Sequence, residues 1–222
     1  MVEPLRLGIV GGTGGEGRGL ALRFALAGSR VTIGSRDAGR AVETAASLRE
    51  RRPAAAIEGA SNRDAISVSD VVILAIPFAH VEATIERERE AFRPGALLLD
   101  VTVPVVFEGG APLFVEPAEG SAAEHVRRHL PAHVALACAF KTLPARFIED
   151  VDRPLDCDDF VCGDSKASRD RAMAIVARIP TLRPIDAGPL DAARTIERMT
   201  LLAITLNRRY KSHAARFQVI GI

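Results

Sequence analysis

Three glycines near the N-terminus have the spacing of a phosphate-binding turn. The pattern Gly-x-Gly-x-x-Gly lies between an apolar run that ends at Val10 and an amphipathic pattern that begins at Leu20. In a strand–turn–helix unit, the first glycine allows a sharp turn, the second lets the backbone approach a pyrophosphate, and the third allows close packing of the helix. Glycine-rich turns are common, but a strand before the turn and a helix after it favour a dinucleotide site. The predicted cofactor-binding residues in this turn are Gly12, Thr13, Gly14, Gly15 and Gly17.

The end of the next predicted strand, residues 31–35, indicates which nicotinamide cofactor is bound. Ser35 and Arg36 end this strand, and Arg40 follows one helical turn later. A hydroxyl and two guanidinium groups suit the 2′-phosphate of NADP(H), because arginine makes charge-assisted bonds to phosphate. Asp37 complicates this interpretation, since NAD sites use a carboxylate here, but it is equally placed to cap the following helix. We therefore expect NADP(H); the alternative is that both arginines are ordinary solvated charges.

Two apolar loops that contain proline follow predicted strands and should lie at one edge of the sheet. They contain Ile76-Pro77 and Val103-Pro104. Because ligands of open α/β sheets bind beyond the carboxyl ends of the strands, these four residues are expected to flank the nicotinamide. His80 follows three residues after Pro77, where contact with the cofactor and a capping or surface role are equally compatible with its position.

Strand and helix patterns alternate along the chain, which is typical of a doubly wound parallel sheet. Residues 70–77 and 96–101 are apolar runs, as expected for strands that are covered on both faces. We predict an α/β fold with a Rossmann-type dinucleotide-binding domain over residues 1–140. A smaller C-terminal α/β unit over residues 141–222 is expected to complete the substrate cleft. Residues 107–120 are rich in proline, glycine and acidic residues and are predicted to form a long loop.

Composition narrows the possible functions. The 222 residues carry a formal net charge of +1, so no general attraction to nucleic acid or to an anionic membrane is expected. The chain has no apolar run of about 18 residues and enters a strand almost at once, which predicts a cytoplasmic protein without a membrane span or signal peptide. Cys138, Cys157 and Cys162 lack the spacing of a zinc site, so we expect buried thiols and no metal.

The predicted final helix, over residues 191–210, carries an apolar stripe. A small C-terminal unit alone leaves such a stripe poorly covered. We therefore expect this helix to pack in the core or across the interface of a homodimer.

Several longer segments, together with the glycine turn, point to one known family. They are Gly34-Ser35-Arg36, Ser121-Ala122-Ala123-Glu124, Thr142-Leu143-Pro144, Val161-Cys162-Gly163-Asp164, and Asp186-Ala187-Gly188-Pro189-Leu190 with Arg194 and Glu197. Over nearly its whole length the chain resembles the NADPH-dependent reductases of the 8-hydroxy-5-deazaflavin coenzyme, the coenzyme F420:NADP oxidoreductases. The resemblance implies that a hydride passes between C4 of the nicotinamide and C5 of the deazaflavin, stacked in a cleft between the two domains. Little acid–base chemistry is then required, because the protein mainly orients two rings.

Lys141 stands at a position where this family typically has a histidine near the deazaflavin. One interpretation is that the lysine replaces that contact. Another is that the site reduces a different small molecule, with Lys141 as a catalytic general acid whose pKa would have to be lowered by burial. A surface lysine at a strand end is the structural alternative. A regulatory protein that binds NADP(H) without turnover is the third functional hypothesis.

Overall fold

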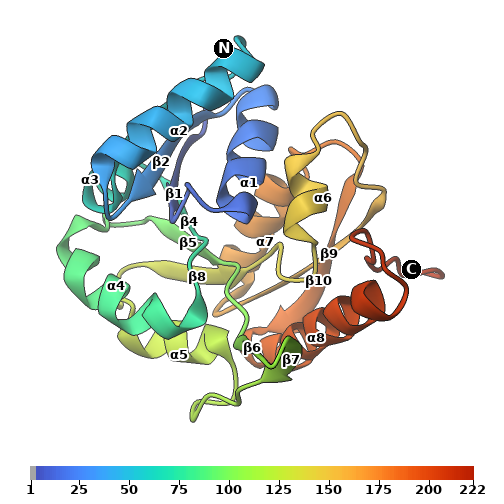
Figure 1. Cartoon of the computed structure of the whole chain (residues 1–222). Coiled ribbons are helices and arrows are strands. Elements are labelled where there is room, and N and C mark those ends of the chain that lie inside the picture. The colour runs from blue at the N-terminus through green and yellow to red at the C-terminus, as the bar shows by residue number, and fades with distance from the viewer. Residues whose placement is uncertain (1–3) are drawn as a thin grey trace.

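The structure, a computed structural model, describes residues 4–222 and contains one sheet of eight strands with helices on both faces (Figure 1). The strand order in this sheet is β10-β9-β8-β5-β4-β1-β2-β3. The strands are β1 (Arg6–Val10), β2 (Arg30–Ser35), β3 (Ile57–Ser61), β4 (Val71–Leu74), β5 (Leu97–Asp100), β8 (Ala135–Cys138), β9 (Cys157–Gly163) and β10 (Leu182–Pro189). The α-helices are α1 (Gly15–Leu26), α2 (Ala38–Arg51), α3 (Asn62–Ser67), α4 (Val81–Glu88), α5 (Ala122–His129), α6 (Ala145–Glu149), α7 (Lys166–Val176) and α8 (Ala193–Arg209).

Most of the sheet is parallel, as the sequence predicts for a Rossmann-type fold. The six strands β3, β2, β1, β4, β5 and β8 run in one direction. The pairing of β8 with β9 is antiparallel, and β9 and β10 run parallel to each other. Both of these reversed strands come from residues 141–222 and extend the same sheet. The division of the chain at residue 140 into two domains remains a proposal.

The strands in the middle of the sheet are buried on both faces, which is the reason for their continuous apolar runs. Successive side chains of a strand point to opposite faces. In β4, Val71 and Ile73 join the core cluster that includes residues of α1, α2, α6 and α7. Val72 and Leu74 join a second cluster with residues of α3, α4 and α5. The prediction of a strand covered on both faces is confirmed for this element.

The segment predicted as a long loop instead contains a β-hairpin, so that prediction is wrong. Strand β6 (Val105–Glu108) pairs antiparallel with β7 (Ala111–Phe114), and the pair lies beside α8 (Figure 1). Gly109 and Gly110 connect the strands with positive φ angles of 53° and 81°. Two successive residues with positive φ make the tight turn whose twist matches a hairpin, and glycine adopts this conformation without steric cost.

Two further sequence predictions concern the cysteines and a membrane-spanning helix. The three cysteines, Cys138, Cys157 and Cys162, are free and buried, as expected. Among residues 4–222, no helix combines the length and the apolar character that a membrane crossing needs.

Candidate functional site

A cleft of about 690 Å³ lies at the carboxyl ends of the parallel strands. This volume is within the range of pockets that hold small-molecule ligands. The glycine turn forms one end of the cleft and α8 forms the other. The cleft is lined by residues 14–17, 75–79, 101–107, 141 and 143–145, by Val115 after the hairpin, and by Thr200 and Ile204 on α8. Ligands of doubly wound sheets bind at this edge, so the cleft has the expected location.

Two residues of the glycine turn, Gly12 and Gly17, lie too close to neighbouring atoms to carry a side chain. A Cβ on Gly12 would lie 2.6 Å from Cβ of Ile33, and a Cβ on Gly17 would lie 2.7 Å from Cα of Gly12. The expected close packing at Gly17 is therefore present. The turn off β1 is made one residue earlier than predicted, at Gly11, which has a φ of 79°. The absence of a side chain at Gly12 instead allows close contact with β2.

The start of α1 is open toward the cleft. Its N-cap is Gly14, which has no side chain to accept a hydrogen bond, so the N–H groups of the first turn are left for a ligand. A Cβ on Gly14 would meet only the carbonyl oxygen of Gly11, at an ordinary 3.5 Å, so the surrounding protein does not demand a glycine there. Gly14, Gly15 and Gly17 line the cleft, whereas Thr13 does not. The backbone carbonyl of Thr13 accepts a hydrogen bond from Arg18.

Two arginines that follow β2 have side chains without partners among the described residues. Arg36 and Arg40 are exposed, and neither guanidinium makes a hydrogen bond or ion pair with any described residue. Asp37 caps α2, because its side chain accepts the backbone N–H of Arg40. The Oγ of Ser35 accepts the N–H of Asp37. The carboxylate that complicated the choice of cofactor therefore has a structural task, and the two cations remain available to a phosphate.

The two proline-containing loops meet in the cleft. Ile76, Pro77, Val103 and Pro104 all line it, as expected from their place after β4 and β5. His80 lies at the end of the single turn of 3-10 helix at Phe78–His80, is exposed, and is not among the lining residues. The structure thus brings together the four apolar residues but leaves His80 outside.

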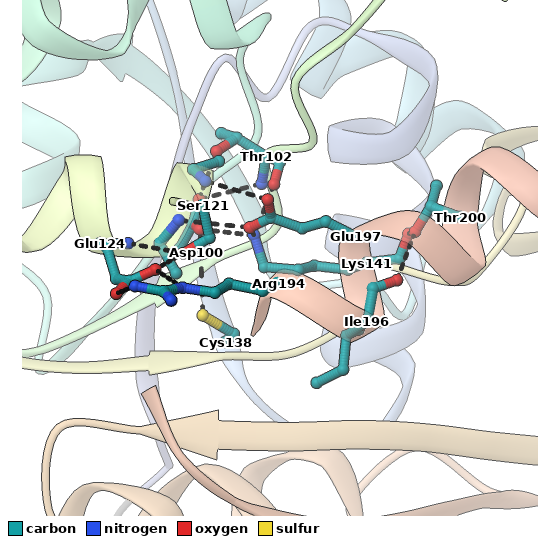
Figure 2. A network of polar contacts seen from close by, with 12 residues as sticks. Asp100, Thr102, Ser121, Glu124, Cys138, Lys141, Arg194, Ile196, Glu197 and Thr200 are labelled. Atoms are coloured by element: carbon teal, nitrogen blue, oxygen red, sulfur yellow. Dashed lines mark hydrogen bonds and ion pairs between the residues drawn. The ribbon is translucent and has the colours of Figure 1, made fainter. Parts of the chain in front are cut away.

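Lys141 lies in a buried network of charged groups beneath the cleft (Figure 2). Its Nζ donates to Oδ2 of Asp100 at 2.6 Å, to Oε1 of Glu197 at 3.1 Å and to the backbone carbonyl of Thr102 at 2.5 Å. The side chains of Lys141, Asp100 and Glu197 are all fully buried. These three bonds use the three N–H donors of the ammonium group, which leaves none for a substrate.

The carboxylates determine the charge of Lys141. Burial alone lowers the pKa of a lysine, but the carboxylates of Asp100 and Glu197 outweigh this effect and hold the pKa of Lys141 well above its usual range. A general acid would require a lowered pKa. The predicted catalytic role of Lys141 therefore does not fit this geometry, and we assign the residue the structural role of joining β5 to α8.

Other bonds of the network fix the position of α8. The backbone N–H groups of Ala122 and Ala123 donate to the carboxylate of Glu197 at 2.9 and 3.2 Å, so that residue also holds the start of α5. The hydroxyl of Thr200 donates to the carbonyl of Lys141 at 2.8 Å (Figure 2). The wall that α8 gives to the cleft is therefore tied to the ends of β5 and β8.

Glu16, in the first turn of α1, is a group that the sequence analysis did not select. Its side chain lines the cleft and is only partly exposed. Desolvation raises the pKa of Glu16 to about 8; Lys141 lowers it, whereas Asp100 and Asp159 raise it further. The carboxyl is thus protonated at neutral pH and adds no negative charge to the phosphate-binding end of α1.

Comparison with known proteins identifies the family. Residues 6–104 match the protein family described as NADP oxidoreductase, coenzyme F420-dependent. The F420-dependent NADP reductase of Methanothermobacter thermautotrophicus is 37% identical over 226 residues, which cover 100% of this chain and 97% of the relative. The F420-dependent NADP reductase of Methanocaldococcus jannaschii is 34% identical and covers 98% of this chain and 99% of the relative. The chain belongs to the family of F420-dependent NADP reductases.

A solved structure from Arthrobacter sp. FB24 has the same fold as this F420-dependent NADP reductase family member. The two chains superpose with a TM-score of 0.83 at 23% identity, over 98% of this chain and 100% of the other. The likeness therefore includes both the parallel strands and the reversed strands at the sheet edge.

A group of possible metal ligands lies outside the cleft, and the sequence analysis missed it. Glu82 on α4 and His125 and His129 on α5 each offer one ligand atom, and these atoms lie within 4.8 Å of one another. Both histidines also contact a carboxylate through Nδ1, Glu119 for His125 and Glu86 for His129. The two histidines are four residues apart in the sequence, which is one turn of a helix, and this spacing is the signal that would have pointed to the group.

Proposed function

We propose that this protein transfers a hydride between NADP(H) and the deazaflavin coenzyme F420. The observation that carries the proposal is one cleft that runs from the uncapped start of α1, past two apolar loops, to α8. Membership in the F420-dependent NADP reductase family supports both substrates. When bound, the nicotinamide supplies or accepts the hydride and the deazaflavin ring is its partner.

The residues of this chain have separate tasks in that reaction. The N–H groups at the start of α1 bind the pyrophosphate, and Gly14 leaves room for its approach. Arg36 and Arg40 bind the 2′-phosphate. The loops that contain Pro77 and Pro104 hold the rings and exclude water. Because the donor and the acceptor are both coenzyme rings, the main contribution of the protein is to orient them.

Turnover with purified F420 tests the proposal. We expect rapid oxidation of NADPH by F420, followed spectroscopically, and little or none with flavin mononucleotide or small ketones as acceptors. The variant Gly14→Ala adds only a Cβ, which would meet nothing closer than the carbonyl oxygen of Gly11 at 3.5 Å, but this Cβ lies where the pyrophosphate must approach, so the variant should bind NADPH more weakly. Reduction of a ketone but not of F420 would favour a different acceptor. Tight NADPH binding without any turnover would favour a regulatory protein.

The pKa of Glu16 predicts how NADPH binding depends on pH. Since this carboxyl is neutral below about 8 and ionised above, raising the pH through this value adds a negative charge beside the phosphate site. We expect the Kd for NADPH to rise about threefold to tenfold between about pH 7 and pH 9.5, as a partly screened charge pair allows. Fluorescence titration across this range measures the effect.

Two variants separate this effect from other titrations. Glu16→Gln should keep its NADPH affinity at high pH, because it cannot ionise. Glu149→Gln is the control, since Glu149 is another carboxylate near the turn, 3.8 Å from a Cβ built on Gly15, and pairs with Arg18. This variant should keep the pH dependence of the unaltered protein. If Glu16→Gln loses affinity at high pH as the unaltered protein does, Glu16 is not the titrating group.

We also propose that the protein is a homodimer. The β6–β7 hairpin pairs with no other strand of the described chain, and an isolated hairpin is marginally stable in water. Leu113 on the hairpin, Val115 directly after it and Leu202 on α8 are exposed apolar side chains. A second copy of the chain would cover this surface. The free cysteines support the further proposal of a reducing, cytoplasmic location.

A further inference from the structure

Two pairs of polar residues meet where α4 and α5 pack against each other. Glu82 and Glu86 are one helical turn apart on α4, and His125 and His129 are one helical turn apart on α5. Residues four apart lie on the same face of a helix, so each pair presents two side chains together. The helices lie side by side (Figure 1), and one ligand atom from each of Glu82, His125 and His129 lies within 4.8 Å of the others.

The backbone that carries these side chains is fixed by the core. Val81 and Ile85 on α4 are buried in one apolar cluster. Val126 on α5 and Leu130, which follows that helix, belong to the same cluster. The start of α5 is held by the two hydrogen bonds from its N–H groups to Glu197. Metal sites need ligands that are held close to their final positions by rigid elements, and α4 and α5 meet this requirement.

Two carboxylates outside the group orient the imidazole rings. Nδ1 of His125 contacts Oε2 of Glu119 at 3.1 Å, and Nδ1 of His129 contacts Oε1 of Glu86 at 3.3 Å. A hydrogen bond from its own backbone N–H lowers the pKa of Glu119, so this carboxylate is ionised at neutral pH and can only accept. In the neutral ring of His125, Nδ1 then carries the proton and Nε2 keeps the lone pair that a metal requires.

The free nitrogens of the two rings are available to an ion from solvent. Nε2 of His125 and Nε2 of His129 make no hydrogen bond with any residue among 4–222. The ring centroids lie 4.7 Å apart, and the ring of His125 also packs edge-on against Phe78 at 5.2 Å. Both histidine side chains are largely buried, at 17% and 16% exposure, whereas Glu82 is exposed. The group is therefore partly shielded but open on the side of Glu82.

The donor atoms are those that zinc prefers. Two imidazole nitrogens and one carboxylate oxygen suit Zn²⁺ and similar transition-metal ions, whereas Mg²⁺ and Ca²⁺ prefer oxygen ligands alone. Bonds of about 2.0–2.2 Å in a tetrahedral site place the ligand atoms about 3.3–3.6 Å apart. Since the three atoms lie within 4.8 Å, they have to approach by no more than about 1.5 Å. The exposed side chain of Glu82 is free to make this movement.

We propose that Glu82, His125 and His129 bind one Zn²⁺ ion, with water in the fourth position. Glu119 and Glu86 are positioning residues that orient the two rings. The ion joins α4 to α5, so it stabilises the folded chain. This proposal departs from the sequence-based expectation of no metal, which rested on the spacing of the cysteines, and it is independent of the proposed function.

Calorimetric titration of the full chain, first freed of metal with a chelator, tests this site. We expect one Zn²⁺ ion to bind per chain and Mg²⁺ not to bind at the same concentration. Zinc at about 100 times its Kd should raise the midpoint of thermal unfolding by about 5–10 °C. The variant Glu119→Gln should weaken Zn²⁺ binding about tenfold, and His125→Gln/His129→Gln should weaken it about 100-fold or more.

His133→Gln is the matched control. His133 lies a few residues after α5, and its Nε2 contacts the backbone carbonyl of Phe92 at 3.1 Å, away from the proposed ligands. This variant should bind Zn²⁺ as tightly as the unaltered protein.

The exposed ligand keeps the test valid if the double variant fails to fold. Glu82→Gln alters an exposed side chain, so it should unfold at the same temperature as the unaltered protein without metal but bind Zn²⁺ more weakly. Equal Zn²⁺ affinity in Glu82→Gln and the unaltered protein, or a Kd above about 1 mM in the unaltered protein, would overturn the proposal.

Discussion

Replacing Lys141 with methionine is expected to lower the free energy of unfolding by about 3–5 kcal/mol, the usual cost of leaving buried charges unpaired. The change removes the only cation that the structure places within hydrogen-bond distance of both Asp100 and Glu197 among the described residues, and both carboxylates are fully buried. For a chain of this size the midpoint of thermal unfolding should fall by about 6–20 °C. Calorimetry or denaturant titration measures this loss.

A triple variant tests the cause of that loss. Lys141→Met combined with Asp100→Asn and Glu197→Gln removes all three charges together, so it should be more stable than Lys141→Met alone. The kinetic outcome is equally informative. If Lys141→Met unfolds within a few degrees of the unaltered protein but loses turnover with F420 selectively, then Lys141 acts on the substrate and our structural assignment is wrong.

Replacing Arg36 with alanine is expected to raise the KM for NADPH about 30-fold, which corresponds to about 2 kcal/mol for hydrogen bonds to a charged phosphate. The KM for NADH should change little, because NADH lacks the 2′-phosphate. The guanidinium of Arg36 makes no bond within the described chain, so its removal should not alter stability. Steady-state kinetics with both nucleotides measures the difference.

Two further variants give the largest expected effect and the control for this experiment. Arg36→Ala/Arg40→Ala removes both cations and should bring the KM for NADPH close to the KM for NADH. Arg51→Ala removes an exposed arginine from the last turn of the same helix, far from the end of β2, and should change neither KM. Equal losses with NADPH and NADH in Arg36→Ala would remove the basis for assigning these arginines to the 2′-phosphate.

Local patterns were enough to predict most of the fold. Continuous apolar runs predicted β4 and β5, and the glycine turn predicted the junction of β1 and α1, because these features depend on neighbours in the sequence. The hairpin at β6 and β7 was missed although its signal was present. Gly109-Gly110 separates two short runs with apolar residues, but nearby prolines and acidic residues made the whole segment resemble a loop.

The electrostatic environment of the site could not be predicted in the same way. The partners of Lys141 are 41 and 56 residues away in the sequence, so a lysine at a strand end gave no sign that all its donors are used. The raised pKa of Glu16 arises from burial and from residues on other elements. In contrast, the role of Asp37 as a helix cap was a local matter, and the structure confirms that interpretation.

The antiparallel junction between β8 and β9 bears on how the protein is made. A chain that has left the ribosome only as far as Phe140 has β8 at an open sheet edge, because β9 supplies the backbone partners of Ala137 and Cys138. Such an exposed strand is a template for pairing with other chains. We expect this edge to stay uncovered during synthesis until residues 157–163 emerge, which makes a chain that ends at Phe140 more prone to aggregation than the whole chain.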